Sequence, residues 1–287
     1  MTIGVLAIWR MGANPSSVDL WSRAAAVSRQ ALEAGALLPV ATRLSRWREK
    51  GVSFQLRSLS AQPAKPVSQA SGNNPFLPYD RQLLVGEVGT AHLLLLNKFP
   101  VVPDHLLLLT RQFQSQTAAL TEADFVAASE LLASADGLLF FNAGIAAGAS
   151  QPHRHMQLIP SPAPDVDDGF PLAPGLLAGD LPWLSLCRRF DALPDARARG
   201  RGWHRFYREA LTLLGLGRSD QDPLQPYNLL ICRRFMAVIP RSVGRVDGFS
   251  VNALGYAGMM LVKDETDAER LQQRSITSVL TACGVTR

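Results

Sequence analysis

The order of polar and apolar residues in one short segment constrains the local structure more than any other part of this chain of 287 residues. His153, His155 and Gln157 occupy every second position, and the apolar residues Met156 and Leu158 alternate with them. In an extended strand, residues two apart point to the same face of a sheet. The pattern therefore predicts a β-strand that carries the histidines and the glutamine on one face and packs its apolar residues on the other.

This polar row suits catalysis by a nucleophilic imidazole, a neighbour that orients it and an amide that hydrogen-bonds an oxygen without transferring a proton. A small-residue loop, Gly148-Ala149-Ser150-Gln151, comes just before it, and the backbone N–H groups of such a loop can approach an anion. As a spacing alone, His-x-His more often marks surface or core histidines. A zinc site is a weaker interpretation, because none of the three cysteines forms a Cys-x-x-Cys pair.

The segment from Phe141-Asn142-Ala143-Gly144 to Gln157 resembles the histidine-triad superfamily. In detail it resembles the diadenosine tetraphosphate phosphorylase (ATP adenylyltransferase) family, in which glutamine replaces the last histidine of the triad. The resemblance extends over nearly the whole chain, through residues 74–76, 94–105, 227–230, 238–242 and 252–259.

Elsewhere the sequence predicts an α+β fold around antiparallel strands. Helices are expected from Ser16 or Ser17 to Gly35, Thr121 to about Ala135, 203–214 and 266–283. Strands are expected at 83–85, 91–99, 106–110, 137–142 and 155–159, with a hairpin over 227–240, a loop over 60–74 and an irregular excursion over 160–182. The resemblance implies a histidine-triad-like antiparallel sheet with packed helices. It also implies a single domain over 1–287, whose N-terminal signature spans about 54–160 and whose C-terminal part, about 200–287, completes the same core.

Charge and composition restrict the classes of partner. The net charge of +5 and a pI near 9.4 would suit nucleic acid, an anionic membrane or a polyanionic small molecule. The sequence contains neither a basic helix interleaved with aromatic residues nor a zinc-finger pattern. Nucleic acid is therefore the less favoured partner. There is no apolar run of about 18 residues and no basic segment before the apolar N-terminus, so neither a membrane span nor a signal peptide is predicted. Three scattered cysteines suit a reducing compartment, and we expect a cytoplasmic protein.

The resemblance implies a reaction in two displacements. His155 attacks the α-phosphorus of diadenosine tetraphosphate (Ap4A), forming an AMP–histidine adduct and releasing ATP, and phosphate then converts the adduct to ADP. His153 would position the nucleophile. Gln157 cannot act as a general acid, because an amide does not titrate at physiological pH, and this favours transfer to phosphate over hydrolysis. The substrates implied are diadenosine polyphosphates, ATP, ADP and phosphate.

The resemblance also assigns residues to substrate binding. By position in the family's motifs these are Lys65, Asn97, Lys98, Asn142, Gly148, Ala149, Ser150, Gln151, Asn252, Ala253, Leu254, Met259 and Lys263. At two places the chain departs from the family's usual serines and threonines: Ala149, and the pair Ala253-Leu254. No tightly bound cofactor and no protein ligand for a metal are implied, and a divalent cation such as Mg²⁺ would accompany the substrate's phosphates. His92 and His105 carry no motif of their own and are interpreted as structural.

Two other functions remain open at this point. A sugar-phosphate uridylyltransferase of the same superfamily uses a similar strand, but with proline between the histidines where Arg154 stands here. A non-catalytic dinucleotide-binding protein would bind the same ligand without turnover.

Overall fold

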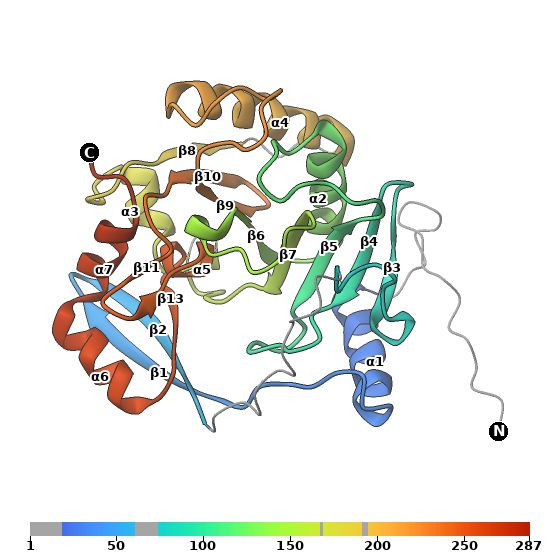
Figure 1. The fold of residues 1–287 in the computed structure, drawn as a ribbon, viewed down its shortest axis with the longest axis horizontal. Coiled ribbons are helices and arrows are strands. Elements are labelled where there is room, and N and C mark those ends of the chain that lie inside the picture. The colour runs from blue at the N-terminus through green and yellow to red at the C-terminus, as the bar shows by residue number, and fades with distance from the viewer. Residues whose placement is uncertain (1–18, 61–73, 167–168, 191–194) are drawn as a thin grey trace.

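A computed structural model describes residues 19–60, 74–166, 169–190 and 195–287. At its centre is an eight-stranded antiparallel sheet in the order β3-β4-β5-β7-β6-β9-β10-β8 (Figure 1). Its strands are β3 (Leu84–Val88), β4 (His92–Leu96), β5 (Leu106–Thr110), β6 (Gly137–Ala143), β7 (His155–Pro160), β8 (Leu186–Arg189), β9 (Tyr227–Cys232) and β10 (Phe235–Pro240). The α+β fold with an antiparallel sheet and the 227–240 hairpin are confirmed. The single domain over 1–287 stays a prediction, although strands from both parts of the chain share this sheet.

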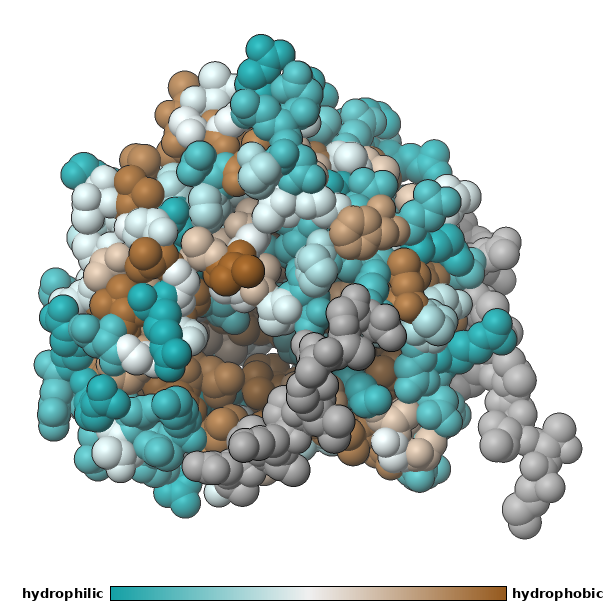
Figure 2. All heavy atoms as spheres, in the orientation of Figure 1, coloured by the Kyte–Doolittle hydropathy of each residue, from teal (hydrophilic) through white to brown (hydrophobic). Residues whose placement is uncertain are grey.

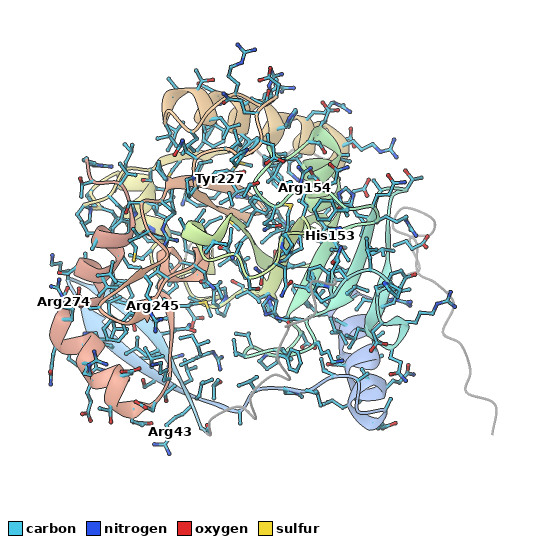
Figure 3. The ribbon with its side chains drawn as sticks, viewed as in Figure 1. Arg43, His153, Arg154, Tyr227, Arg245 and Arg274 are labelled. Atoms are coloured by element: carbon cyan, nitrogen blue, oxygen red, sulfur yellow. The ribbon has the colours of Figure 1, made fainter. Side chains whose placement is uncertain are left out.

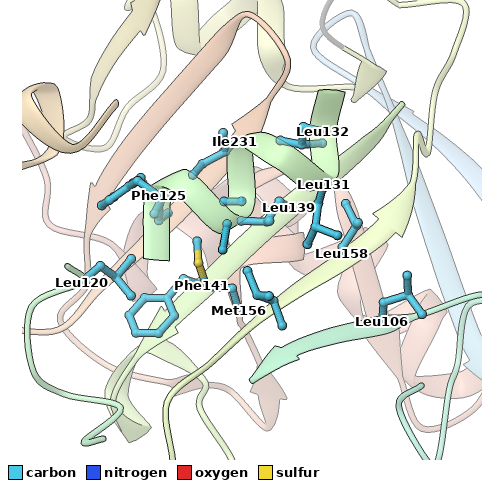
Figure 4. Close-up of a cluster of buried hydrophobic side chains, with 14 of the residues drawn as sticks. Leu106, Leu120, Phe125, Leu131, Leu132, Leu139, Phe141, Met156, Leu158 and Ile231 are labelled. Carbon is cyan, nitrogen blue, oxygen red and sulfur yellow. The ribbon is translucent and has the colours of Figure 1, made fainter. Parts of the chain in front are cut away.

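Three helices cover one face of the sheet: α1 (Leu20–Glu33), α2 (Glu122–Ser134) and α4 (Ala196–Leu213). Met156 and Leu158 of β7 point into this layer and pack in one buried cluster with residues of α2 such as Phe125 (Figure 4). The predicted alternation along β7 is therefore confirmed. The predicted N-cap of α2 is confirmed too, because Thr121 and Asp124 form a capping box.

The opposite face of the sheet packs on a second buried cluster. Its elements are the three-stranded sheet of β1 (Thr42–Glu49), β2 (Val52–Leu59) and β13 (Met259–Val262), the short pair β11 (Arg245–Val246) and β12 (Phe249–Ser250), and the helices α3 (Ala173–Ala178), α5 (Ala253–Tyr256), α6 (Glu265–Arg274) and α7 (Ile276–Cys283). Two 3-10 turns complete the structure, η1 (Arg81–Leu83) and η2 (Ile145–Ala147). On the side shown in Figure 2, the surface is hollowed near its middle and hydrophobic residues line the hollow.

Several local predictions were wrong or incomplete. The expected helix over 266–283 is two helices, because Ser275 has a φ of 72° and caps α7 instead of continuing α6. The hairpin of β1 and β2 was not predicted from the sequence. Its two turn residues, Lys50 and Gly51, both have positive φ, which tight two-residue hairpin turns require. Helix α1 is capped by Asp19, and the expected start at Ser16 or Ser17 lies outside the described residues. In the ranges that the structure describes, no helix is both long and apolar enough to span a bilayer.

Candidate active site

The polar row lies on the face of the sheet opposite to helices α1, α2 and α4. His155 is the first residue of β7 and Gln157 follows on the same face. His153 was predicted on the same strand, but it lies just before β7 and pairs through one isolated bridge with Ser115. The rings of His153 and His155 still lie together, since Phe76 contacts both at centroid distances of 5.8 and 5.3 Å. Figure 3 shows His153 and Arg154 near the ends of strands β4 and β5.

The hydrogen bonds of His155 define its reactive nitrogen. Its Nδ1 lies 2.8 Å from the carbonyl oxygen of His153. A carbonyl can only accept, so Nδ1 carries the proton and the lone pair is on Nε2. The ring is buried, and burial lowers its pKa from 6.5 to about 4. At neutral pH His155 is therefore an uncharged imidazole with a free nucleophilic nitrogen.

Gln116 holds the main chain of the nucleophile. Pairing between β6 and β7 ends at Phe140 and Gln157, so the backbone of His155 has no partner on β6. The Gln116 side chain replaces that partner. Its oxygen accepts from the N–H of His155 at 2.8 Å, and its NH2 group donates to the carbonyls of Asn142 at 2.9 Å and His155 at 3.3 Å. Sequence reasoning missed this buried residue, which belongs to no motif.

The ring of His153 is fully used in hydrogen bonding. Its Nε2 lies 2.8 Å from the carbonyl oxygen of Thr110 and must donate to it. Its Nδ1 accepts from the amide of Asn74 at 2.8 Å. Burial lowers the pKa of His153 as well. With both nitrogens occupied, His153 can position its neighbour through its own carbonyl, but it offers no free lone pair for attack.

The loop before the histidines is tightly closed. Gly148 has a φ of 91°, and a Cβ atom there would lie 2.7 Å from Cβ of Asn252, so the close contact between these segments requires glycine. The N–H groups of Gly148 and Ala149 donate within the turn, to the carbonyls of Ile145 and Gly144. From the sequence, the N–H groups of this loop were expected to face an anion, but these two are already used within the turn. Ser150, which is exposed, stays a candidate substrate contact.

Asn142 ties that loop to the C-terminal segment. Its side-chain oxygen accepts from the N–H of Ala253 and from the amide of Asn228, both at 2.9 Å. The buried guanidinium of Arg241 donates to the side-chain oxygen of Asn228 and to the carbonyl of Ala147. The structure thus brings together two of the predicted segments, and it adds Asn228 and Arg241. Both added residues lie in stretches that carried the family resemblance.

The remaining predicted substrate residues are less directly placed. Asn252 caps α5 by accepting from the N–H of Leu254. Met259 is buried on β13, Leu254 packs on the second cluster, Gln151 is half-buried, and Lys98 and Lys263 are exposed. Asn97 hydrogen-bonds His105. Lys65 lies outside the described residues. Among those that are described, no three histidine, cysteine or acidic side chains gather in a way that could hold a metal ion.

Comparisons with known proteins agree with this geometry. Residues 12–178 match the Ap4A phosphorylase N-terminal domain, and residues 179–286 match the ATP adenylyltransferase C-terminal domain. The chain belongs to the Ap4A phosphorylase family. Its members are nucleotidyltransferases, and the family predicted from the sequence is confirmed.

Two relatives from Saccharomyces cerevisiae support the assignment to the Ap4A phosphorylase family. Diadenosine 5',5'''-P1,P4-tetraphosphate phosphorylase 2 is 30% identical over 267 residues, covering 79% of this chain and 81% of the relative. Protein APA1 is 30% identical over 246 residues, covering 74% of this chain and 76% of that protein. The fold is similar to the crystal structure of yeast Ap4A phosphorylase Apa2 in complex with Ap4A, with a TM-score of 0.77 and 24% identity over 94% of this chain and 98% of that one. The complex of Apa2 with AMP gives a TM-score of 0.76, with 24% identity over 94% of this chain and 99% of that one.

Proposed function

We propose that this chain catalyses the reversible phosphorolysis of Ap4A, in which Ap4A and phosphate give ATP and ADP, through an AMP adduct on His155. The observation that carries the proposal is the fixed tautomer of the nucleophile. Nδ1 of His155 donates to the carbonyl of His153, which leaves Nε2 unprotonated, and Gln157 follows two residues later on the same strand.

In the first displacement, Nε2 of His155 forms a bond to the α-phosphorus while the bond from that phosphorus to the bridging oxygen breaks, and ATP leaves. The imidazole becomes positively charged, and its Nδ1–H then donates more strongly to the carbonyl of His153. In the second displacement, an oxygen of inorganic phosphate attacks the same phosphorus. The P–N bond breaks, ADP forms and the ring returns to its neutral state.

Gln157 has no titratable group that could protonate the leaving group, and ATP needs no such proton. The terminal phosphate of ATP has a second pKa of about 6, as phosphate monoesters do, so ATP can depart without receiving a proton. Gln157 is then needed only to hydrogen-bond an oxygen of the transferred phosphoryl group. Hydrolysis would require a group that activates water, and an amide cannot serve as that base.

Phosphate dependence tests the function. Incubation of the protein with Ap4A should yield ATP and ADP only when phosphate is supplied, as resolved by chromatography of the nucleotides. Rapid formation of AMP and ATP without phosphate would show that the site is hydrolytic. Release of glucose 1-phosphate from UDP-glucose would indicate a uridylyltransferase, and binding without turnover or adduct would indicate a non-catalytic dinucleotide-binding protein.

The pH dependence tests the state of the nucleophile. Because burial lowers the pKa of His155 to about 4, kcat/KM for Ap4A should stay constant from neutral pH to about pH 5 and fall only below it. The unfolded chain protonates this ring near 6.5 and the folded chain near 4, so the fold itself loses stability as the pH falls through that window. Circular dichroism at each pH serves as the control. An acid limb centred near 6.5 in folded protein would mean that the nucleophile is solvated.

We further propose the cation, the partners and the compartment of this reaction. A divalent cation such as Mg²⁺ would enter with the phosphates of the substrate. The partners are small nucleotides, without a role for nucleic acid or membranes, and the cytoplasm is the expected compartment.

A further inference from the structure

Two asparagines near the site form the same local turn and hold a histidine in the same way. In Asn74-Pro75-Phe76, the N–H of Phe76 donates to the side-chain oxygen of Asn74 at 3.0 Å. In Asn97-Lys98-Phe99, the N–H of Phe99 donates to the side-chain oxygen of Asn97 at 3.2 Å. Such turns fix the amide of the asparagine. In each case the NH2 group then faces Nδ1 of a histidine, His153 for the first turn and His105 for the second.

The second turn determines the direction of a whole chain of hydrogen bonds. A backbone N–H can only donate, so the side-chain oxygen of Asn97 is the acceptor and its NH2 group faces His105 at 3.2 Å. Nδ1 of His105 must therefore accept, and its proton is on Nε2. That nitrogen lies 2.9 Å from the side-chain oxygen of Gln157 and donates to it. The amide of Gln157 is thus oriented by donor and acceptor chemistry.

Burial keeps this direction fixed. His105 is buried, and burial lowers its pKa to about 4, so at neutral pH it carries one proton and cannot donate from both nitrogens. Among the described residues, His105 is the only hydrogen-bond partner of the Gln157 side chain. The oxygen of Gln157 is therefore occupied, and its NH2 group is left to bind a ligand.

We propose that Asn97 and His105 are positioning residues that turn the amide of Gln157 so that its nitrogen, and not its oxygen, faces the phosphoryl group transferred at His155. The proposal rests on the proposed function and deepens it. An NH2 group can donate to the negatively charged non-bridging oxygens, whereas an amide oxygen in the same place would repel them. Asn97, predicted as a substrate ligand, then acts through His105, and His105 is more than a structural histidine.

The first test reads the tautomers directly. Long-range proton–nitrogen NMR of the protein labelled with ¹⁵N-histidine distinguishes protonated from unprotonated ring nitrogens. At neutral pH, His105 should carry its proton on Nε2 and His155 on Nδ1, with assignments taken from single-histidine variants. A proton on Nδ1 of His105, or a doubly protonated ring, would overturn the proposal. This measurement needs no substrate, so its outcome is independent of whether Ap4A is the substrate.

The second test uses variants that keep or remove the donor to Gln157. His105→Gln retains an N–H near the place of Nε2, whereas His105→Leu does not. We expect His105→Leu to lower kcat for Ap4A phosphorolysis by about 10- to 100-fold with little change in KM, and His105→Gln to recover most of the loss.

His92 provides the matched control, because it is also a buried histidine but hydrogen-bonds Asp124 of α2, on the helix-covered face. His92→Leu should lower thermal stability without the selective fall in kcat. If His105→Leu and His105→Gln lose the same activity, or if His92→Leu reproduces the loss at matched stability, His105 contributes packing alone and the proposal is wrong.

Discussion

Replacing His155 with alanine should lower kcat by at least about 10⁴-fold, a loss of the size expected when a covalent nucleophile is removed. His153 cannot take over the attack, since its two ring nitrogens are held by Asn74 and Thr110. Dinucleotide binding and the fold should remain largely intact, because Gln116 holds the backbone of residue 155 independently of its side chain. Steady-state kinetics, binding by calorimetry and circular dichroism measure these three properties.

Companion variants separate attack from positioning. His153→Ala should still form some adduct, but more slowly, because the backbone carbonyl that holds Nδ1 of His155 loses the ring that anchors it. His155→Gly should be partly rescued by added imidazole, which can occupy the vacated space. His204→Ala is the control for loss of a histidine outside the polar row, since His204 lies on α4 and contacts Phe125 in the helical layer. It should retain nearly full activity.

Trapping locates the adduct. Incubation with radiolabelled Ap4A and no phosphate should label His155 through a bond that is labile in acid and stable in base, as expected of a phosphoramidate. The label should disappear in His155→Ala and should be discharged as ADP when phosphate is added to the native protein. Label on His153, or label that survives His155→Ala, would refute the assignment of the nucleophile.

The features that the sequence predicted correctly depend on neighbours along the chain. Alternation at Met156 and Leu158 is enough to identify the buried side of β7, and Thr121 with Asp124 is enough to mark the start of α2. The helix break at Ser275 is equally local, but it depends on a single positive φ, and a serine in the sequence does not predict a positive φ.

The features that the sequence did not predict depend on contacts between distant segments. Gln116 reaches His155 across 39 positions, and His105 reaches Gln157 across 52. Neither contact has a spacing that could reveal it. The direction of a hydrogen bond is even harder to predict from the sequence, because it depends on which donor and acceptor atoms face each other in the folded chain. One signal could have been used: asparagine and phenylalanine recur two apart at Asn74 and Asn97, and each turn holds a histidine.

The largest effect on stability is expected at Asp124 of α2, on the helix-covered side of the sheet. Its carboxylate is almost fully buried and accepts from Nε2 of His92 at 2.8 Å, from the guanidinium of Arg154 at 3.1 Å, and from both the N–H and the hydroxyl of Thr121. Burial alone would raise the pKa of Asp124, but the hydrogen bond from His92 and the charge of Arg154 outweigh it and the pKa is lowered. The carboxylate is therefore ionised at neutral pH and balances the buried charge of Arg154.

Asp124→Ala should lower the free energy of unfolding by about 3–5 kcal/mol, the usual result of leaving one member of a buried ion pair without its partner. Urea denaturation measures the change. Glu209→Ala, which removes one partner of the half-exposed pair with Arg188, should change stability little.

Removing both charges, with Asp124→Leu and Arg154→Met together, should recover much of the loss, because no unpaired charge is then buried. If the double variant is as unstable as Asp124→Ala, the cost lies in the cap of α2 and the contact with His92 rather than in the charge of Arg154.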